Sequence, residues 1–123
     1  MAMRRSIVAL CIVLWAVPIA AQVDPLRELD SLAQTTADPG AGIALARQQA
    51  ARGDLIGAMA TTERIIALHP ESDDALLYHV SLLCRLDDPE GARTEIAELQ
   101  GVRTDGDWSP VIAACGPGIR GRG

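Results

Sequence analysis

Three cysteines and two histidines are the most reactive side chains of this 123-residue sequence. Cys11 lies in an apolar stretch near the amino terminus, whereas Cys84 and Cys115 lie in the second half of the chain. An even pair of cysteines favours a disulfide in an oxidising compartment. The C-x-x-C spacing that often supplies a reactive thiol is absent. We therefore predict a Cys84–Cys115 disulfide, and the alternative is a pair of buried thiols that act as small apolar side chains.

The remaining polar residues form no recognisable catalytic set. Ser81 and Ser109 have no histidine at a suggestive spacing, and the histidines, His69 and His79, have no pattern of metal ligands around them. Two groups of carboxylates stand where helices are predicted to begin, and helix N-termini attract carboxylates through the helix dipole. These groups are Glu71, Asp73 and Asp74, and Asp87, Asp88 and Glu90. We expect no enzymatic activity, no cofactor and no metal site.

The first 21 residues have the order of a secretory signal. Arg4 and Arg5 precede an apolar run over 7–17, and small residues follow Pro18. We interpret 1–21 as a signal peptide, which predicts an exported, periplasmic protein that meets the membrane transiently. One alternative is an uncleaved signal that anchors the chain in the inner membrane, because Ile19 is a poor residue two places before the cut. The other is a buried N-terminal helix.

The composition gives the chain an acidic character. The sequence has 11 basic and 16 acidic residues, and loss of Arg4 and Arg5 with the signal leaves nine basic residues and a net charge of −7. This charge argues against nucleic acid and anionic membrane surfaces as main partners. Phe is absent and Tyr occurs once. The core must therefore be built from Ala, Leu, Ile and Val, whose small side chains suit closely spaced helices.

Helical periodicity and helix-capping residues predict an all-α fold. Aspartate or serine precedes the apolar runs, proline follows at several first turns, and glycine or proline follows at the ends. A capping helix is expected within 22–38 and a mobile tail over 116–123. The predicted helices are 25–35, 41–52, 54–69, 74–86, 89–100 and a short segment over 108–115.

Residues 41–100 contain two copies of one predicted helix-turn-helix unit. With Ala58 set over Ala92, the two copies are offset by 34 residues, and a two-helix period of this length is a repeat signature. Apolar positions of the two copies coincide at this offset. One common core is therefore predicted from Ala46, Ala58, Ile65, Val80, Ala92, Ile96 and Leu99.

The unit resembles a tetratricopeptide repeat over about half of the chain. The matching residues in the first copy are Leu45, Ala46, the Gly53-Asp54-Leu55 turn, Ala58, Ile65, Ile66, Leu68 and Pro70, and the second copy keeps Ala92 and Leu99. Gly42, Thr62 and Ile96 replace the aromatic residues of the family pattern. His79 stands where Leu is usual, and we interpret this as one extra residue in the Asp87-Asp88 turn.

The resemblance implies a short α-solenoid with repeats over 39–72 and 73–106 and a partial repeat over 107–115. First helices of such repeats lie side by side, which would bring Cys115 beside Cys84, and they line a groove that binds a protein or peptide. The Lys and Asn set with which some members clamp a peptide carboxylate is missing. The implied groove residues are Ile43, Arg47, Ala50, Leu77, Ser81 and Arg85.

The function that follows is an exported scaffold module for protein–protein interaction in the cell envelope, for example in an outer-membrane assembly. The alternative is a thiol- or disulfide-dependent envelope factor that uses Cys84 and Cys115. Short repeat arrays need their ends covered. We therefore expect an open end near Trp108 that another subunit of a homo-oligomer, a partner or further chain covers.

Overall fold

The computed structural model describes residues 24–100 and 106–120, and all regular structure in these ranges is helical. The predicted all-helical fold is confirmed, whereas the predicted signal peptide lies outside the described residues. Helix limits agree with the sequence prediction to within two residues, and Asp54 caps the third helix as predicted. The elements are α1 (Pro25–Thr36), α2 (Pro39–Ala51), α3 (Leu55–Leu68), α4 (Asp73–Arg85), α5 (Pro89–Gln100), α6 (Ser109–Cys115) and the 3-10 helix η1 (Pro117–Arg120).

Short polar side chains begin most of the helices. Asp24, Asp38, Asp54 and Ser72 each accept a hydrogen bond from a backbone N–H in the first turn of the next helix, where four N–H groups lack helical partners. At α6 the sequence predicted Ser109 as the cap. The structure instead has Trp108 at that position, and the acceptor for Ser109 N–H is the carboxylate of Asp107, 2.9 Å away.

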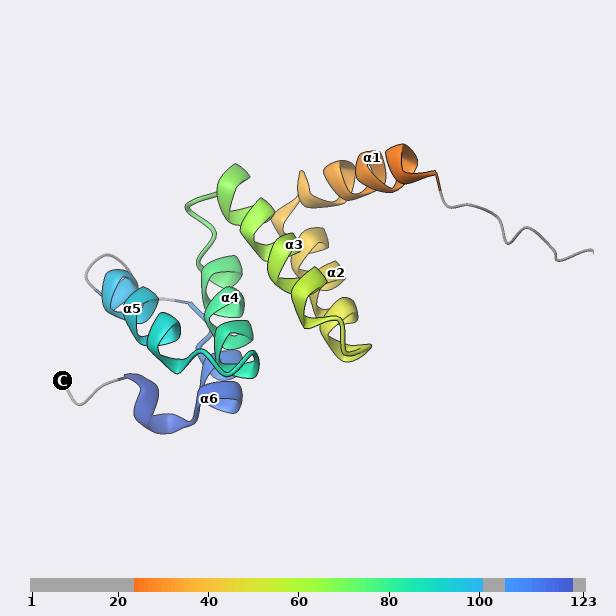
Figure 1. Cartoon of the computed structure of the whole chain (residues 1–123). Helices are drawn as coiled ribbons and strands as arrows, with labels where there is room; N and C mark the ends of the chain where they lie inside the picture. Colours follow the sequence, from red (N-terminus) through yellow and green to blue (C-terminus); the bar gives the residue numbers. More distant parts are fainter. Residues whose placement is uncertain (1–23, 101–105, 121–123) are drawn as a thin grey trace, which may run out of the picture.

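Helix α4 is the centre of the fold. It packs against α2 and α3 on one side and α5 and α6 on the other, while α1 extends away from the rest after contacting α2 and α3 (Figure 1). A helix enclosed in this way must bury most of its circumference. Seven residues of α4 are buried, namely Ala75 and every residue from 77 to 82.

The turn between α2 and α3 and the turn between α4 and α5 have equivalent backbone hydrogen bonds at the 34-residue offset. Asp54 N–H donates to Gln49 O at 3.0 Å, and Asp88 N–H donates to Leu83 O at 2.9 Å. Gly53 and Asp87 both have positive φ, 85° and 63°. The second turn therefore contains no extra residue. Our inference of an extra residue in this turn is therefore wrong. At the 34-residue offset, His79 corresponds to Leu45.

The predicted core residues are buried, but they belong to two clusters rather than one. Leu99 is half-buried and the other six are almost fully buried. Both clusters include side chains of α4. The first contains Ile43, Ala46, Ala50, Ala58, Ile65, Ala75, Tyr78 and Leu82, and the second contains Leu77, Val80, Ala92, Ile96, Trp108 and Val111.

The carboxyl-terminal part of the described chain closes the second cluster. The predicted disulfide is confirmed, with Cα atoms of Cys84 and Cys115 5.3 Å apart, and it ties α6 to α4. Trp108 is only 7% exposed, so the expected open surface around this residue is wrong. The expectation of a tail with nothing to bury also needs correction, because Ile119 in η1 packs against the same cluster.

Candidate functional site

The groove implied by the family resemblance is closed in this structure. Ile43, Ala50, Leu77 and Ser81 are buried, with exposures of 7%, 3%, 3% and 2%. Ile43 and Ala50 lie between α2 and α4 in the first cluster, and Leu77 lies in the second. Ser81 donates its hydroxyl to Tyr78 O at 2.6 Å. These four residues belong to the interior and line no open surface.

The two arginines of the predicted groove also make internal contacts. The guanidinium of Arg47 lies over the ring of Tyr78, 5.5 Å from its centroid, which is a cation–π distance. Arg85 donates to Ala50 O at 3.2 Å. Both contacts join α2 to α4. Ile43, Ala50 and the two arginines therefore mark a seam between α2 and α4, whereas Leu77 lies in the second cluster.

The open concavity of this molecule lies on the other side of α4. A cleft of about 570 Å³ separates α3 from α5, which pack against α4 rather than closely against each other. This volume is within the usual range for ligand sites, about 300–1,000 Å³. Its lining comprises Glu63, Ile66, Ala67 and Pro70 after or within α3, Leu76 and His79 of α4, and Glu95, Glu98 and Leu99 of α5.

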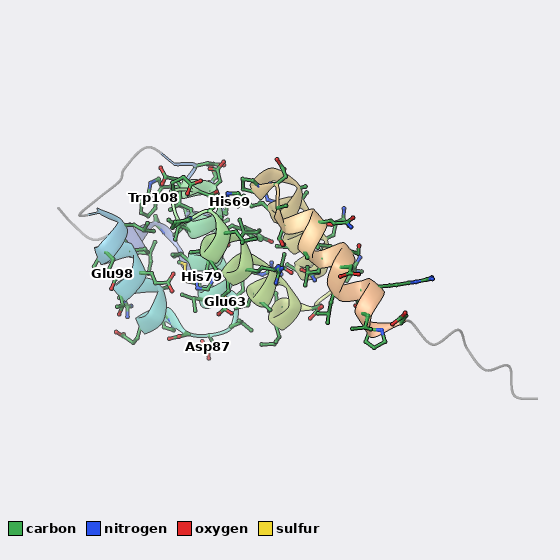
Figure 2. All side chains as sticks on the ribbon, turned by 90° about the horizontal axis from the view of Figure 1, so that it is seen from above. Glu63, His69, His79, Asp87, Glu98 and Trp108 are labelled. Carbon is green, nitrogen blue, oxygen red and sulfur yellow. A yellow bond between two sulfur atoms is a disulfide. The ribbon has the colours of Figure 1, made fainter. Side chains whose placement is uncertain are left out.

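Helical spacing explains why these side chains share the cleft. On α3 and just beyond it, residues 63, 66, 67 and 70 follow the i, i+3, i+4, i+7 pattern of one helix face. Residues 95, 98 and 99 follow the same pattern on α5, and 76 and 79 on α4. Figure 2 shows Glu63, His79 and Glu98 on these three successive helices. The cleft is thus walled by single faces of three helices.

His79 is the polar centre of the cleft. Its side chain is 9% exposed, with Nδ1 3.2 Å from Thr62 Oγ1 and Nε2 3.1 Å from Glu95 Oε1. The Thr62 hydroxyl donates its proton to Met59 O at 2.8 Å, so toward His79 it can only accept. Nδ1 therefore donates to Thr62 Oγ1, while Nε2 faces the carboxylate of Glu95.

The cleft has an acidic lining. Three carboxylates line it, and one of them, Glu95, is hydrogen-bonded to His79. Within the described ranges, Glu63 and Glu98 form no ion pair, and both are exposed. Ile66, Ala67, Pro70, Leu76 and Leu99 supply the apolar remainder. The site therefore combines apolar surface with two uncompensated negative charges.

Sequence reasoning missed this cleft, although the sequence contained a signal for it. Thr62 corresponds to Ile96, and His79 corresponds to Leu45, so each polar residue replaces an apolar residue at the equivalent repeat position. The side chains of these two polar residues are hydrogen-bonded to each other. Comparison of the copies for polarity differences would have selected the pair.

Three comparisons with known proteins gave no match to this chain. No family model matches it, and no curated protein or solved structure gives a significant match. In the described part of the chain, no helix has the length and apolar character needed to cross a membrane. The same residues contain no group of three or more His, Cys, Asp or Glu side chains placed to hold a metal ion.

Proposed function

We propose that this protein is a tetratricopeptide-like binding module of the cell envelope, and that it binds a partner protein in the cleft between α3 and α5. The helix-pair repeat supports the family resemblance, because the turns at Gly53 and Asp87 have the same hydrogen bonds at the 34-residue offset. The signal-like sequence over 1–21 and the intramolecular disulfide are both compatible with export.

The observation that carries this proposal is the apolar cleft itself. A small helical protein normally covers the apolar faces of its helices, and an uncovered concave apolar surface with a polar edge marks a binding site. Ala67 and Pro70 at its rim are exposed, so a partner can reach the apolar surface behind them. We therefore move the binding surface of the module from the seam between α2 and α4 to the opposite side of α4.

A structural role for the disulfide accounts for the two cysteines better than a redox role. The sulfurs of Cys84 and Cys115 are bonded to each other and lie against the second cluster. A redox factor needs an accessible thiolate of lowered pKa, and neither the spacing of these cysteines nor their apolar surroundings provides one. The bond instead holds α6 on α4.

Site-specific photocross-linking in intact cells tests the proposed surface. A photoreactive residue replaces Ala67 in the cleft, Arg47 at the α2–α4 seam, or Ala97, which is an exposed alanine on the face of α5 turned away from the cleft. We expect a discrete protein adduct from position 67 and none from positions 47 and 97. An adduct from position 47 without one from position 67 would return the site to the original groove.

A further inference from the structure

The shape of the cleft selects one mode of peptide recognition. Strand addition requires an exposed sheet edge, and the described residues form no strand. Polyproline recognition uses grooves lined by aromatic rings, and the lining here contains no Phe, Tyr or Trp. Phosphopeptide recognition uses arginine clusters, whereas this lining is acidic. Capture of a chain terminus uses a nest of backbone groups, whereas this cleft is walled by the side chains of three helices. The remaining mode is an amphipathic helix laid in a groove.

The length of one wall suits such a helix. The face of α3 that lines the cleft runs from Glu63 to Ala67, a helical rise of about 6 Å, and Pro70, two residues past the end of α3, lengthens this wall to between one and two turns. A helix presents two turns of apolar side chains at positions i, i+3, i+4 and i+7. Three or four aliphatic side chains of an incoming helix therefore match the length of the cleft.

Carboxylates lie on both walls of the cleft. The bonds of His79 hold Thr62 and Glu95 at one level, and Glu63 is adjacent to Thr62 in the chain. The apolar side chains of Ile66, Ala67, Pro70, Leu76 and Leu99 begin about one turn from this level, and Glu98, adjacent to Leu99, lies among them. Negative charge therefore accompanies the apolar side chains along the cleft, and its counterpart on a ligand must be positive.

We propose that the occupant of the cleft is an amphipathic helix of a partner protein that carries aliphatic side chains over one to two turns and an Arg or Lys beside that apolar face. This inference rests on the proposed function. The basic group pairs with the carboxylates of Glu63 and Glu98, which no described cation neutralises. Glu95 stays hydrogen-bonded to His79, which holds that carboxylate in place.

A phage-displayed peptide library tests the inference on the full chain. The library peptides are about 15 residues long, near the length at which isolated helices begin to form, with Leu fixed at i, i+3, i+4 and i+7 and all other positions random. We expect selection of Arg or Lys at one flank of the Leu stripe. Selected peptides should bind Glu63→Gln/Glu98→Gln about three- to tenfold more weakly, with a smaller effect of salt. The exposed Glu28→Gln on α1 is the matched control and should bind normally.

Two tryptophan substitutions distinguish failure of this inference from failure of the proposed function. Ala67→Trp fills the cleft, whereas Ala97→Trp adds the same side chain on the face of α5 turned away from the cleft. Peptides that lose binding to Ala67→Trp but show no basic selection would overturn the charge inference and leave the cleft as the site. Peptides that bind Ala67→Trp and the parent equally, or a library that yields no binder, would overturn both.

Discussion

Gly53 and Asp87 occupy the same left-handed backbone position 34 residues apart, with φ of 85° and 63°. Each follows the last turn of the first helix in a pair, and each is followed by an aspartate that caps the second helix. Left-handed backbone is the ordinary way to end a helix. It costs an L-residue about 1 kcal/mol more than glycine, and Asp tolerates it better than most.

Substitutions at these equivalent positions should therefore have opposite effects. Asp87→Gly should raise the free energy of unfolding by about 0.5–1 kcal/mol, whereas Gly53→Ala should lower it by about 1–2 kcal/mol. Asp87→Asn removes the charge and retains tolerance of positive φ, so it is the control for electrostatic effects. Urea unfolding measures all three. Destabilisation by Asp87→Gly would contradict the assignment of a strained turn.

The buried bond between Thr62 and His79 leads to an asymmetric prediction. Thr62→Val keeps the shape of the side chain but removes the acceptor for His79 Nδ1–H, and an unpaired buried donor costs about 1–3 kcal/mol. His79→Leu should cost less, because the Thr62 hydroxyl still donates to Met59 O and Leu is the counterpart residue in the first copy. Thermal and urea unfolding report both values.

A double variant completes this test. Thr62→Val/His79→Leu should be more stable than Thr62→Val alone, because the second change removes the unpaired donor. Thr62→Ser keeps the hydroxyl and is the control for loss of the methyl group. The account of His79 fails if His79→Leu is as costly as Thr62→Val and the two effects simply add.

Removal of the disulfide should weaken the whole fold. Cys84 and Cys115 are 31 residues apart, and a bond that closes a loop of this size contributes about 3–4 kcal/mol in the chain-entropy estimate. Cys84→Ala/Cys115→Ala should lose about this much free energy of unfolding. Intact mass after alkylation of the denatured protein without reductant provides the direct check. Two alkyl groups on this pair would mean that no bond had formed.

Asp107 gives a prediction for acidic pH. The side-chain and backbone hydrogen bonds from Ser109 hold the pKa of this carboxyl below its ordinary value, and the charge of Arg47 acts in the same direction. A depressed folded pKa contributes stability above the unfolded value and loses it as pH falls through the folded value. Asp107→Asn keeps an oxygen acceptor but cannot titrate. The difference in Tm between the two proteins should be constant from about pH 7 to pH 5 and should shrink below about pH 4. A difference that stays constant to the lowest pH would contradict this role.

Local features of the chain were predictable because they depend on nearby residues. Helix starts follow from Asp38, Asp54 and Ser72, and the disulfide follows from the place of Cys84 and Cys115 in successive first helices. The binding surface was not predictable in this way. Whether Leu77 faces a groove or an interior depends on how α6 closes on α4, and 34-residue periodicity contains no information about that contact.

The cleft depends on a separation between helices that are far apart in the sequence. Glu63 and Glu98 each look like ordinary exposed residues of a solvated helix face. They become one site because α4 holds α3 and α5 apart. The polarity differences at Thr62 and His79 were visible in the sequence, but our assumption of an extra residue in the second turn concealed the equivalence of His79 and Leu45.

Methyl-resolved NMR of the full chain with a library-selected peptide tests the central claim most directly. Docking in the cleft predicts that the methyl signals of Ile66, Leu76 and Leu99 shift on titration, while those of Ile43 and Leu77 in the interior and Leu26 on α1 do not. The same shifts should be absent in Ala67→Trp and present in Ala97→Trp. Shifts confined to Leu26 and Leu29, or unchanged in Ala67→Trp, would contradict the assignment of the cleft as the binding site.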